Sequence, residues 1–425
     1  MRSVRWGIAV GLVLVAGACG ADDGPRFARD AGAPDAAQIP PGDTGGGVFD
    51  DVGEASGAMD AGSGGADLGN RDAEGEVGGE EGGDDMGAEP DAAVDLEPIP
   101  YTNPVLNASG DPDALKINGM YYVFLPRQIR KDGNPVGGKV VAYTSKDLVH
   151  WRARGEVYNN QNIAYGGNRS RGLWAPEVLA HNGRFYLYAV NVMSGGRDAS
   201  TVGNKDIVVI SSTDPLNFNG QPQKVLLDDG YAFIDPSPFV DPKSGDMFLL
   251  YKRRGRLGTG SSIHIRPMSG PRGFSGPATR LVHSDEFSGS QNIVEHPMLH
   301  YQGGVYFFLF SYGKGDDAGA EGYRVRYATS RKPMGPYTQR GILLGRDTVD
   351  GGKPIWAPGA TSVVRDGDNR AWLVYRQKTT RDTTFANRAV CIERLLVRPN
   401  ANPPSMAATP TRGIERDGPT PLSAP

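Results

Sequence analysis

The chain has very little cysteine, with only Cys19 and Cys391 among its 425 residues. Two cysteines are too few for the disulfide framework of a small secreted domain. Cys391 lies in the apolar run AVCIERLLV, which is typical of a buried core thiol. With Cys19 at the N-terminus as a candidate lipid attachment point, no internal disulfide is expected.

Long hydrophobic runs are also missing. The apolar run at residues 6–15 is too short to span a bilayer as a mature helix. It follows Arg2 and Arg5 and precedes Ala16-Gly17-Ala18-Cys19, a pattern typical of a signal peptide. This pattern resembles a bacterial lipobox, although Ala16 replaces its usual Leu. We expect residues 1–19 to direct export, with Cys19 carrying a lipid anchor to the cell envelope at the outer membrane or cell surface; an ordinary signal peptide is the alternative.

Residues 20–100 lack nearly everything that builds a core. From 21 to 100 the only aromatic residues are Phe27 and Phe49, and 21 acidic residues face three arginines, a net charge of −18. Such a segment buries too little apolar surface to offset its chain entropy, which predicts a disordered, acidic linker. The remaining chain carries a net charge of about +12. It has neither a Lys/Arg run nor a nucleic-acid motif, so we expect no nucleic-acid partner.

Helical periodicity of useful length is absent from residues 101–400, and an internal repeat is present instead. Each copy has a short apolar stretch, a polar turn and an aromatic run, and the spacing is roughly sixty residues. The five copies start at Asp111, Ala175, Asp235, Glu295 and Ala357. We predict an all-β fold, a five-bladed β-propeller over 101–398, with four strands per blade; a sandwich is the alternative. Residues 399–425, rich in Pro, Ala and Thr, are predicted to be a disordered tail.

Acidic residues begin the first, third and fourth copies: Asp111, Asp235 and Glu295. Equivalent positions of a propeller meet at its axis, so these carboxyl groups are expected to share one cavity. Repulsion and burial should raise at least one pKa there, which separates an acid from a base. Glycoside hydrolysis needs such a pair. The alternative is that these acids only bond backbone amides.

Two tryptophans are candidates for sugar binding. Trp174 precedes the second copy and Trp356 the fifth, both in a Trp-Ala-Pro setting. We expect them at the same mouth of the channel, as flat apolar platforms. A place in the core is the alternative for each.

Four motifs in order carry a family resemblance: NPVL-x-x-x-x-DPD from Asn103, LWAPE, FIDPSPF and VEHPML. Together they closely resemble glycoside hydrolase family 43, whose members are five-bladed propellers and inverting glycosidases acting on arabinans, xylans and related hemicelluloses. The resemblance covers essentially all of 101–398. It implies that Asp111 is the general base, Asp235 tunes the acid and orients the substrate, and Glu295 is the general acid.

Other residues take roles through the same resemblance. Asp113 is a less suitable base because it is out of phase with Asp235 and Glu295. Arg388 resembles an arginine found near the sugar, with a surface salt bridge as the alternative. His296 stands where the family often has a small residue, so it is expected to contact or crowd the sugar.

The resemblance also bears on a metal. Many members, especially arabinanases, carry Gly-x-Gly-His at the start of the fifth blade, where the His helps to hold a central cation. Here Ala360 replaces that His. We therefore assign no metal ligand and expect no required cofactor, and a structural calcium ion has little support.

The leading functional hypothesis is an inverting glycosidase acting on arabinose- or xylose-containing polysaccharides or oligosaccharides, of the α-L-arabinofuranosidase, arabinanase or β-xylosidase type. A non-catalytic carbohydrate-binding propeller at the cell surface is the alternative, but a lectin needs no acid/base pair. A fructan-acting enzyme is a third candidate, and the Asp-Pro-Asn-Gly sequence expected of that class is absent. We expect a monomer with a carbohydrate substrate and a lipid-anchored membrane contact.

Overall fold

A computed structural model describes the chain from residue 96 to residue 422. Ten short internal ranges are left out: 132–133, 162–163, 166–167, 194–204, 227–231, 255–259, 288–292, 314–321, 347–353 and 382–386. The predicted signal peptide, Cys19 and the linker up to residue 95 lie outside the described residues.

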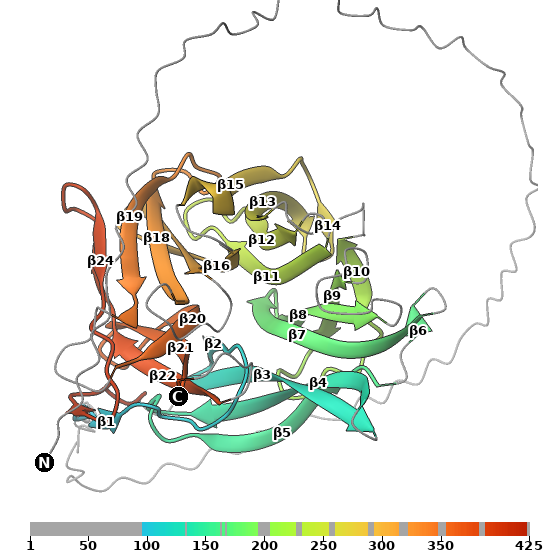
Figure 1. The fold of residues 1–425 in the computed structure, drawn as a ribbon, viewed down its shortest axis with the longest axis horizontal. Coiled ribbons are helices and arrows are strands. Elements are labelled where there is room, and N and C mark those ends of the chain that lie inside the picture. Colours follow the sequence, from blue (N-terminus) through green and yellow to red (C-terminus); the bar gives the residue numbers. More distant parts are fainter. Residues whose placement is uncertain are drawn as a thin grey trace, which may run out of the picture. The chain divides into compact units, whose positions relative to one another are not determined.

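Five antiparallel sheets follow one another along the chain, and each begins with a strand next to the central axis (Figure 1). Sheet one comprises β2 (Asp113–Ile117), β3 (Met120–Lys131), β4 (Asn134–Ser145) and β5 (Arg152–Asn159). Sheet two comprises β7 (Asn168–His181), β8 (Arg184–Met193), β9 (Lys205–Ser212) and β10 (Gln223–Leu226), with β6 (Ala164–Tyr165) paired to β7 at the edge. Sheet three comprises β11 (Ala232–Val240), β12 (Met247–Arg254), β13 (Ser261–Gly270), β14 (Gly273–Phe274) and β15 (Thr279–His283). Sheet four comprises β16 (Ile293–Gln302), β17 (Val305–Gly313), β18 (Arg324–Ser330) and β19 (Thr338–Leu344). Sheet five comprises β20 (Trp356–Arg365), β21 (Ala371–Lys378) and β22 (Arg388–Arg394).

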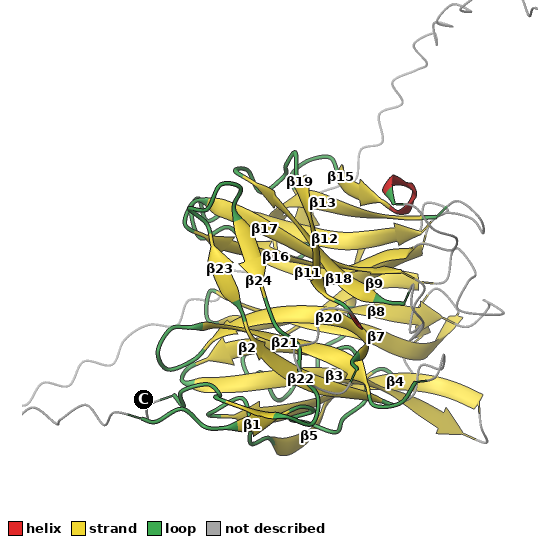
Figure 2. Ribbon diagram, turned by 60° about the vertical axis from the view of Figure 1, so that its left-hand side comes forward, coloured by secondary structure: helices red, strands yellow, loops and turns green. Residues whose placement is uncertain are grey.

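The innermost strands close a ring. In turn, β2 contacts β7, β7 contacts β11, β11 contacts β16, β16 contacts β20, and β20 returns to β2. This is the predicted all-β, five-bladed propeller, and each sheet is one blade. Figure 2 shows the strands stacked from the side. The short 3₁₀ helix η1 (Ser284–Glu286) follows β15. None of the described segments forms a helix long and apolar enough to cross a membrane.

The hydrophobic core is divided among the junctions between neighbouring blades. Phe124 of blade 1 packs with Leu187 of blade 2, for example, and Phe307 of blade 4 packs with Tyr375 of blade 5. Cys391 is fully buried in the latter cluster, as its apolar surroundings predict. The aromatic runs of the repeat are second strands, whose two faces serve two junctions, and this explains why they are apolar almost throughout.

The ring is closed by segments from both ends of the described chain. Blade 5 has three strands of its own, and the backbone of Val105 and Leu106 pairs with Val390 on β22 in the fourth place. The expectation of four strands from the fifth copy itself is therefore wrong for this blade.

The predicted disordered tail is also wrong for residues 399–422. This segment forms β24 (Ser405–Ala407), which pairs with β23 (Leu396–Arg398), and β25 (Glu415–Arg416), which pairs with β1 (Tyr101–Thr102). Thr411 and Thr420 are buried, and Leu422 joins the core beside blade 1. Composition misled here, because a few buried residues and backbone bonds to the blades are enough to order a segment rich in Pro and Ala.

Candidate active site

The same local backbone conformation recurs in the first strands of blades 2 to 5. Pairing with the second strand shifts register there, and one residue at each shift has a positive φ: Ala175 (42°), Asp235 (55°), His296 (48°) and Ala357 (45°). Each of these residues is followed by proline. A β-bulge re-aims side chains, and left-handed non-glycine residues cluster at functional sites because the conformation is strained. The repeat therefore turns equivalent residues of each blade toward the axis.

The positions of these left-handed residues show that the three acids do not occupy equivalent places in their blades, although the sequence repeat aligned them. Asp235 occupies the left-handed position of blade 3, but in blade 4 that position belongs to His296, and Glu295 comes one residue earlier. The three acids are consequently not strictly equivalent. They nevertheless converge, because the bulge lets Glu295 and His296 contribute to the same site.

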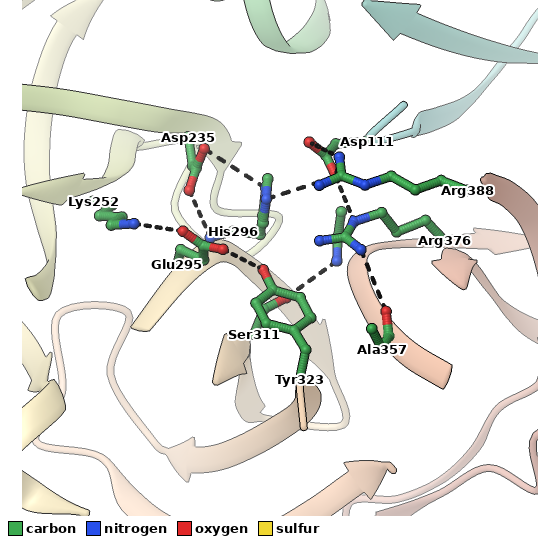
Figure 3. Close-up of polar contacts among 11 residues, drawn as sticks. Asp111, Asp235, Lys252, Glu295, His296, Ser311, Tyr323, Ala357, Arg376 and Arg388 are labelled. Carbon is green, nitrogen blue, oxygen red and sulfur yellow. Dashed lines mark hydrogen bonds and ion pairs between the residues drawn. The ribbon is translucent and has the colours of Figure 1, made fainter. Parts of the chain in front are cut away.

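His296 lies between two of the predicted catalytic carboxyl groups (Figure 3). Its Nε2 is 3.8 Å from Oδ1 of Asp111, and its Nδ1 is 3.8 Å from Oδ1 of Asp235. Its backbone N–H donates to Oδ2 of Asp235 over 3.2 Å. The imidazole thus fills the space that a smaller residue would leave open between these acids.

Two arginines of blade 5 hold Asp111. Nη1 of Arg388 donates to both carboxylate oxygens, at 3.0 and 3.1 Å, and Nε of Arg376 lies 2.5 Å from Oδ1. Burial alone would raise the pKa of Asp111, but Arg388, Arg376 and His296 together hold it well below its usual range. Asp111 is therefore an ionised carboxylate at neutral pH, as a general base must be.

Glu295 has a cation and a phenol as partners. Nζ of Lys252 lies 2.5 Å from Oε2, and the Tyr323 hydroxyl donates to Oε1 over 2.6 Å. Burial raises the pKa of Glu295, but Lys252, His296 and the Tyr323 hydrogen bond outweigh it and lower the pKa to about 2. In this arrangement Glu295 is also ionised.

Asp235 is the carboxyl group whose pKa is raised. Burial is the largest cause, and the negative charges of Glu295 and Asp111 add to it, against the opposing effects of His296 and Lys252. At least one pKa is raised, as expected. Repulsion between Asp235 and Glu295 acts on both carboxyl groups, but at Glu295 the cation of Lys252 outweighs it, so the pKa of Glu295 is lowered. Lys252 dominates the electrostatics of Glu295, so the proton resides more readily on Asp235.

Arg376 connects the two sides of the site. Its side chain is only 1% exposed, and its guanidinium stacks on the ring of Tyr323 at 4.7 Å. Nη1 also donates to the carbonyl of Ala357 over 3.3 Å. Contacts therefore run from Asp111 through Arg376 and Tyr323 to Glu295 and fix the separation of base and acid.

Two more carboxyl groups, those of Asp113 and Glu177, lie on the first strands of blades 1 and 2. Asp113 accepts the backbone N–H of Val178 over 2.8 Å and so links blades 1 and 2. Burial raises its pKa to about 7 and, together with the charge of Asp113, raises the pKa of Glu177 well above the usual range. Asp113 is tied to the scaffold and tends to be protonated, which fits its exclusion as the base.

A small pocket borders the site, and the side chains that line it bear on whether the site could hold calcium. Its lining includes Asp111, Glu177, His296, Ala360 and Thr361. Ala360 offers no ligating atom, and no cluster of three or more His, Cys, Asp or Glu suited to a metal occurs in the described part of the chain. These residues do not fit the histidine-held cation that the family resemblance implies, so we derive no step through a metal.

The two tryptophans are half-buried beside cations. Trp174 lies in β7 with Nζ of Lys205 at 5.7 Å from its ring, and Trp356 begins β20 with the guanidinium of Arg412 at 4.4 Å. Arg412 belongs to the ordered C-terminal segment, so one face of Trp356 is already covered. Neither ring is brought to the acids by a contact between described residues.

Three residues of the site were missed from sequence: Lys252, Tyr323 and Arg376. A signal for two of them was present, because the aromatic runs of copies three and five end in Lys252 and Arg376. The antiparallel pairing places Lys252 opposite Ile234, next to Asp235, and Arg376 opposite Gly359. Lys252 and Arg376 each follow the aromatic run of a second strand, and this position lies across from the bulge of the first strand and so at the site.

The geometry has a counterpart among known proteins. The family model of glycosyl hydrolases family 43 matches residues 101–403, which is the entire propeller. This chain belongs to that family. It is accordingly a glycosidase, and the expected propeller and glycoside hydrolase assignment are confirmed.

Several individual proteins are also similar to this chain in sequence or structure. The extracellular endo-α-(1→5)-L-arabinanase 1 of Bacillus subtilis is 25% identical over 237 residues, 52% of this chain and 68% of that protein. A β-xylosidase of Formosa agariphila is 22% identical over 69% of this chain but only 48% of its own length. A thermostable family-43 glycoside hydrolase of known structure is 25% identical with a TM-score of 0.60, over 75% of this chain and 99% of that chain. The chain thus spans about half the length of several curated relatives that it matches.

Proposed function

We propose that this family 43 glycosidase releases or cleaves arabinosyl or xylosyl units by an inverting mechanism. One observation carries the proposal: a doubly arginine-bound, ionised Asp111 shares a site with Glu295, and Arg376 and Tyr323 connect the two. Printed names of relatives support the sugar class, since they include arabinanases, an arabinofuranosidase and a β-xylosidase.

The reaction needs two proton transfers. Asp111 accepts a proton from water as the water oxygen attacks the anomeric carbon, and Glu295 donates a proton to the departing glycosidic oxygen. Such a pair is expected roughly 6.5–9.5 Å apart, which leaves room for the water molecule. Because Glu295 is ionised in the free protein, it must gain its proton before bond cleavage. Asp235, with its raised pKa, is the adjacent source.

The sugar is held, in this proposal, by the residues that line the approach to the acids. His296 and Arg388 already contact Asp111, so a sugar at the base meets both. Trp174 and the uncovered face of Trp356, on the first strands of blades 2 and 5, are proposed as apolar platforms for the substrate. Arg388 binds the base as well as the sugar, which goes beyond a simple surface salt bridge.

The test is product stereochemistry. The purified protein is incubated with nitrophenyl pentosides, arabinan and xylan, and the first-formed anomer is followed by proton NMR. Inversion is expected, and retention or the absence of any hydrolysis contradicts the proposal. Asp111→Asn and Glu295→Gln should each abolish turnover without lowering the melting temperature, whereas Glu156→Gln, on the exposed strand β5, should retain full activity. Intact binding without turnover would favour the carbohydrate-binding alternative.

We also propose that Cys19 anchors an exported, monomeric enzyme to the membrane. Export is supported by relatives whose names include "extracellular". Membrane fractionation of Cys19→Ser tests the anchor: the variant should become soluble, and continued membrane association would contradict the proposal.

A further inference from the structure

A second cavity, of about 380 Å³, lies at the junction of blades 2 and 3. Its lining is Arg184, Tyr186, Gly270, Pro271, Arg272 and Gly273. The residues come from the start of β8 and from the hairpin between β13 and β14. Its volume falls in the range of small-molecule sites.

This cavity is on the face opposite to the acids. In blade 2, Arg184 pairs with His181 at one end of the β7–β8 ladder, and Val190 pairs with Trp174 near the site end. Six residues separate Arg184 from Val190, or about 20 Å at the usual rise of a strand. A ligand in the cavity cannot also occupy the catalytic site.

The cavity is preformed by two hydrogen bonds between the blades. The Tyr188 hydroxyl of blade 2 donates to the carbonyl of Pro271 over 2.5 Å. Nη2 of Arg272 donates to Oγ of Ser211 over 2.6 Å, which extends this side chain from blade 3 across blade 2. A ligand therefore meets an arginine that is already positioned, and less ordering entropy is lost on binding.

The chemistry of the lining selects the ligand. Two guanidinium groups face one cavity, its lining contains no carboxylate, and no carboxylate among the described residues forms an ion pair with either arginine. Guanidinium groups bind carboxylates through paired N–H donors. The Tyr186 ring supplies a flat surface. An added Cβ at Gly270 would meet no atom within 4 Å, so the space beside this residue is free for a ligand. A carboxylate attached to a flat-faced, partly apolar ring fits this set.

We propose that the cavity binds a uronic acid residue of a polysaccharide and thereby holds the enzyme on carboxylated polymers. The choice of a sugar acid rests on the proposed polysaccharide-degrading function. Binding at the opposite face leaves the catalytic mouth free for a neighbouring chain. The net positive charge of the propeller, in contrast to the acidic N-terminal segment, favours the same ligand.

The experiment is affinity electrophoresis of the full chain in gels containing glucuronoxylan or the same polymer after reduction of its carboxyl groups. The protein carries Glu295→Gln, so the polymer stays intact. Retardation is expected only with the carboxylated polymer, and it should weaken as salt rises. Arg184→Gln with Arg272→Gln should lower the apparent affinity about tenfold or more, since two charge-assisted contacts are lost.

Matched controls separate the site from general charge. Arg152→Gln with Arg154→Gln removes the same charge from exposed positions of β5 and should keep the affinity. If the double cavity variant unfolds, Arg184→Gln alone, on an exposed side chain, gives the same comparison. Equal retardation by the reduced polymer, no retardation at all, or equal losses in both charge variants overturns the proposal. Hydrolysis of a nitrophenyl pentoside by the cavity variant without Glu295→Gln tests the proposed catalysis separately and should be unchanged.

Discussion

Replacing Lys252 with methionine should move the alkaline limb of the pH profile of kcat/KM to higher pH by at least one unit. The limb reports loss of the general acid's proton. Lys252 favours the ionised form of Glu295 and therefore lowers its pKa. Without the ammonium group, Glu295 keeps its proton to a higher pH, so the active protonation state persists further into the alkaline range.

The magnitude follows from the geometry of the pair. Two unit charges 2.5 Å apart interact by about 7 kcal/mol at an effective dielectric constant of about 20, which is an upper bound. The pKa of Glu295 falls from 4.5 to about 2 although burial acts in the opposite direction. One pKa unit corresponds to about 1.4 kcal/mol, so a shift of one to two units uses less than half of that interaction. Methionine has a similar length and suits a side chain that is 3% exposed.

The assay compares two aryl pentosides. One has a poor leaving group that needs the acid, and the other has a dinitrophenolate that departs without a proton. The limb should shift only with the first. Lys139→Met, which removes a half-exposed lysine paired with Glu156, is the matched control and should leave the profile unchanged. A stable Lys252→Met enzyme with an unmoved limb, or one moved to lower pH, refutes the electrostatic reasoning.

Three further outcomes are expected. Tyr323→Phe removes a hydrogen bond that stabilises ionised Glu295, so its alkaline limb should also rise, by less than in Lys252→Met, in the same assay. Asp235→Asn should lower kcat while the melting temperature stays constant. It should also move the alkaline limb of the pH profile to lower pH, because a carboxylate that repels ionised Glu295 is lost. A fall in melting temperature with an unmoved limb would indicate a structural role. Asn103→Ala should cost about 2–3 kcal/mol in urea unfolding, since its buried amide bonds the backbone of Ile392 and the carboxylate of Glu393; a loss below about 0.5 kcal/mol would contradict this.

The repeat made the propeller and its axis predictable. Each copy contains a strand that starts at the channel and an aromatic strand that is buried on both faces, so the period alone positions Asp111, Asp235 and Glu295 near one another. Which residue of the fourth copy is equivalent to Asp235 was not predictable, because this depends on a bulge that gives His296, and not Glu295, the left-handed backbone. Proline follows each bulge residue and was visible, but proline does not by itself reveal a register shift.

Electrostatics at the acids was the less predictable part. Repulsion among carboxylates suggested that at least one pKa is raised, but that argument omitted the cations of neighbouring strands, which lower the pKa values of Glu295 and Asp111. Lys252 reaches Glu295 from blade 3, and Arg376 reaches Asp111 from blade 5, 265 positions away in the chain. Contacts between blades form only when the ring closes, so they cannot be predicted from the sequence of one copy considered alone.

Both ends of the described chain meet at the seam that completes the propeller. The N–H of Ile99 donates to the carbonyl of Pro419, β1 pairs with β25 through two residues, and the N–H of Leu422 donates to the carbonyl of Lys146. A mechanical pull on the chain at residue 96 therefore loads this short pair before any blade. Behind it stands Asn103, bonded to blade 5. The seam and the pairing of Val105 and Leu106 with blade 5 thus stand between such a pull and Asp111, which follows them in the chain, so this pairing shields the catalytic base from tension on the N-terminal side.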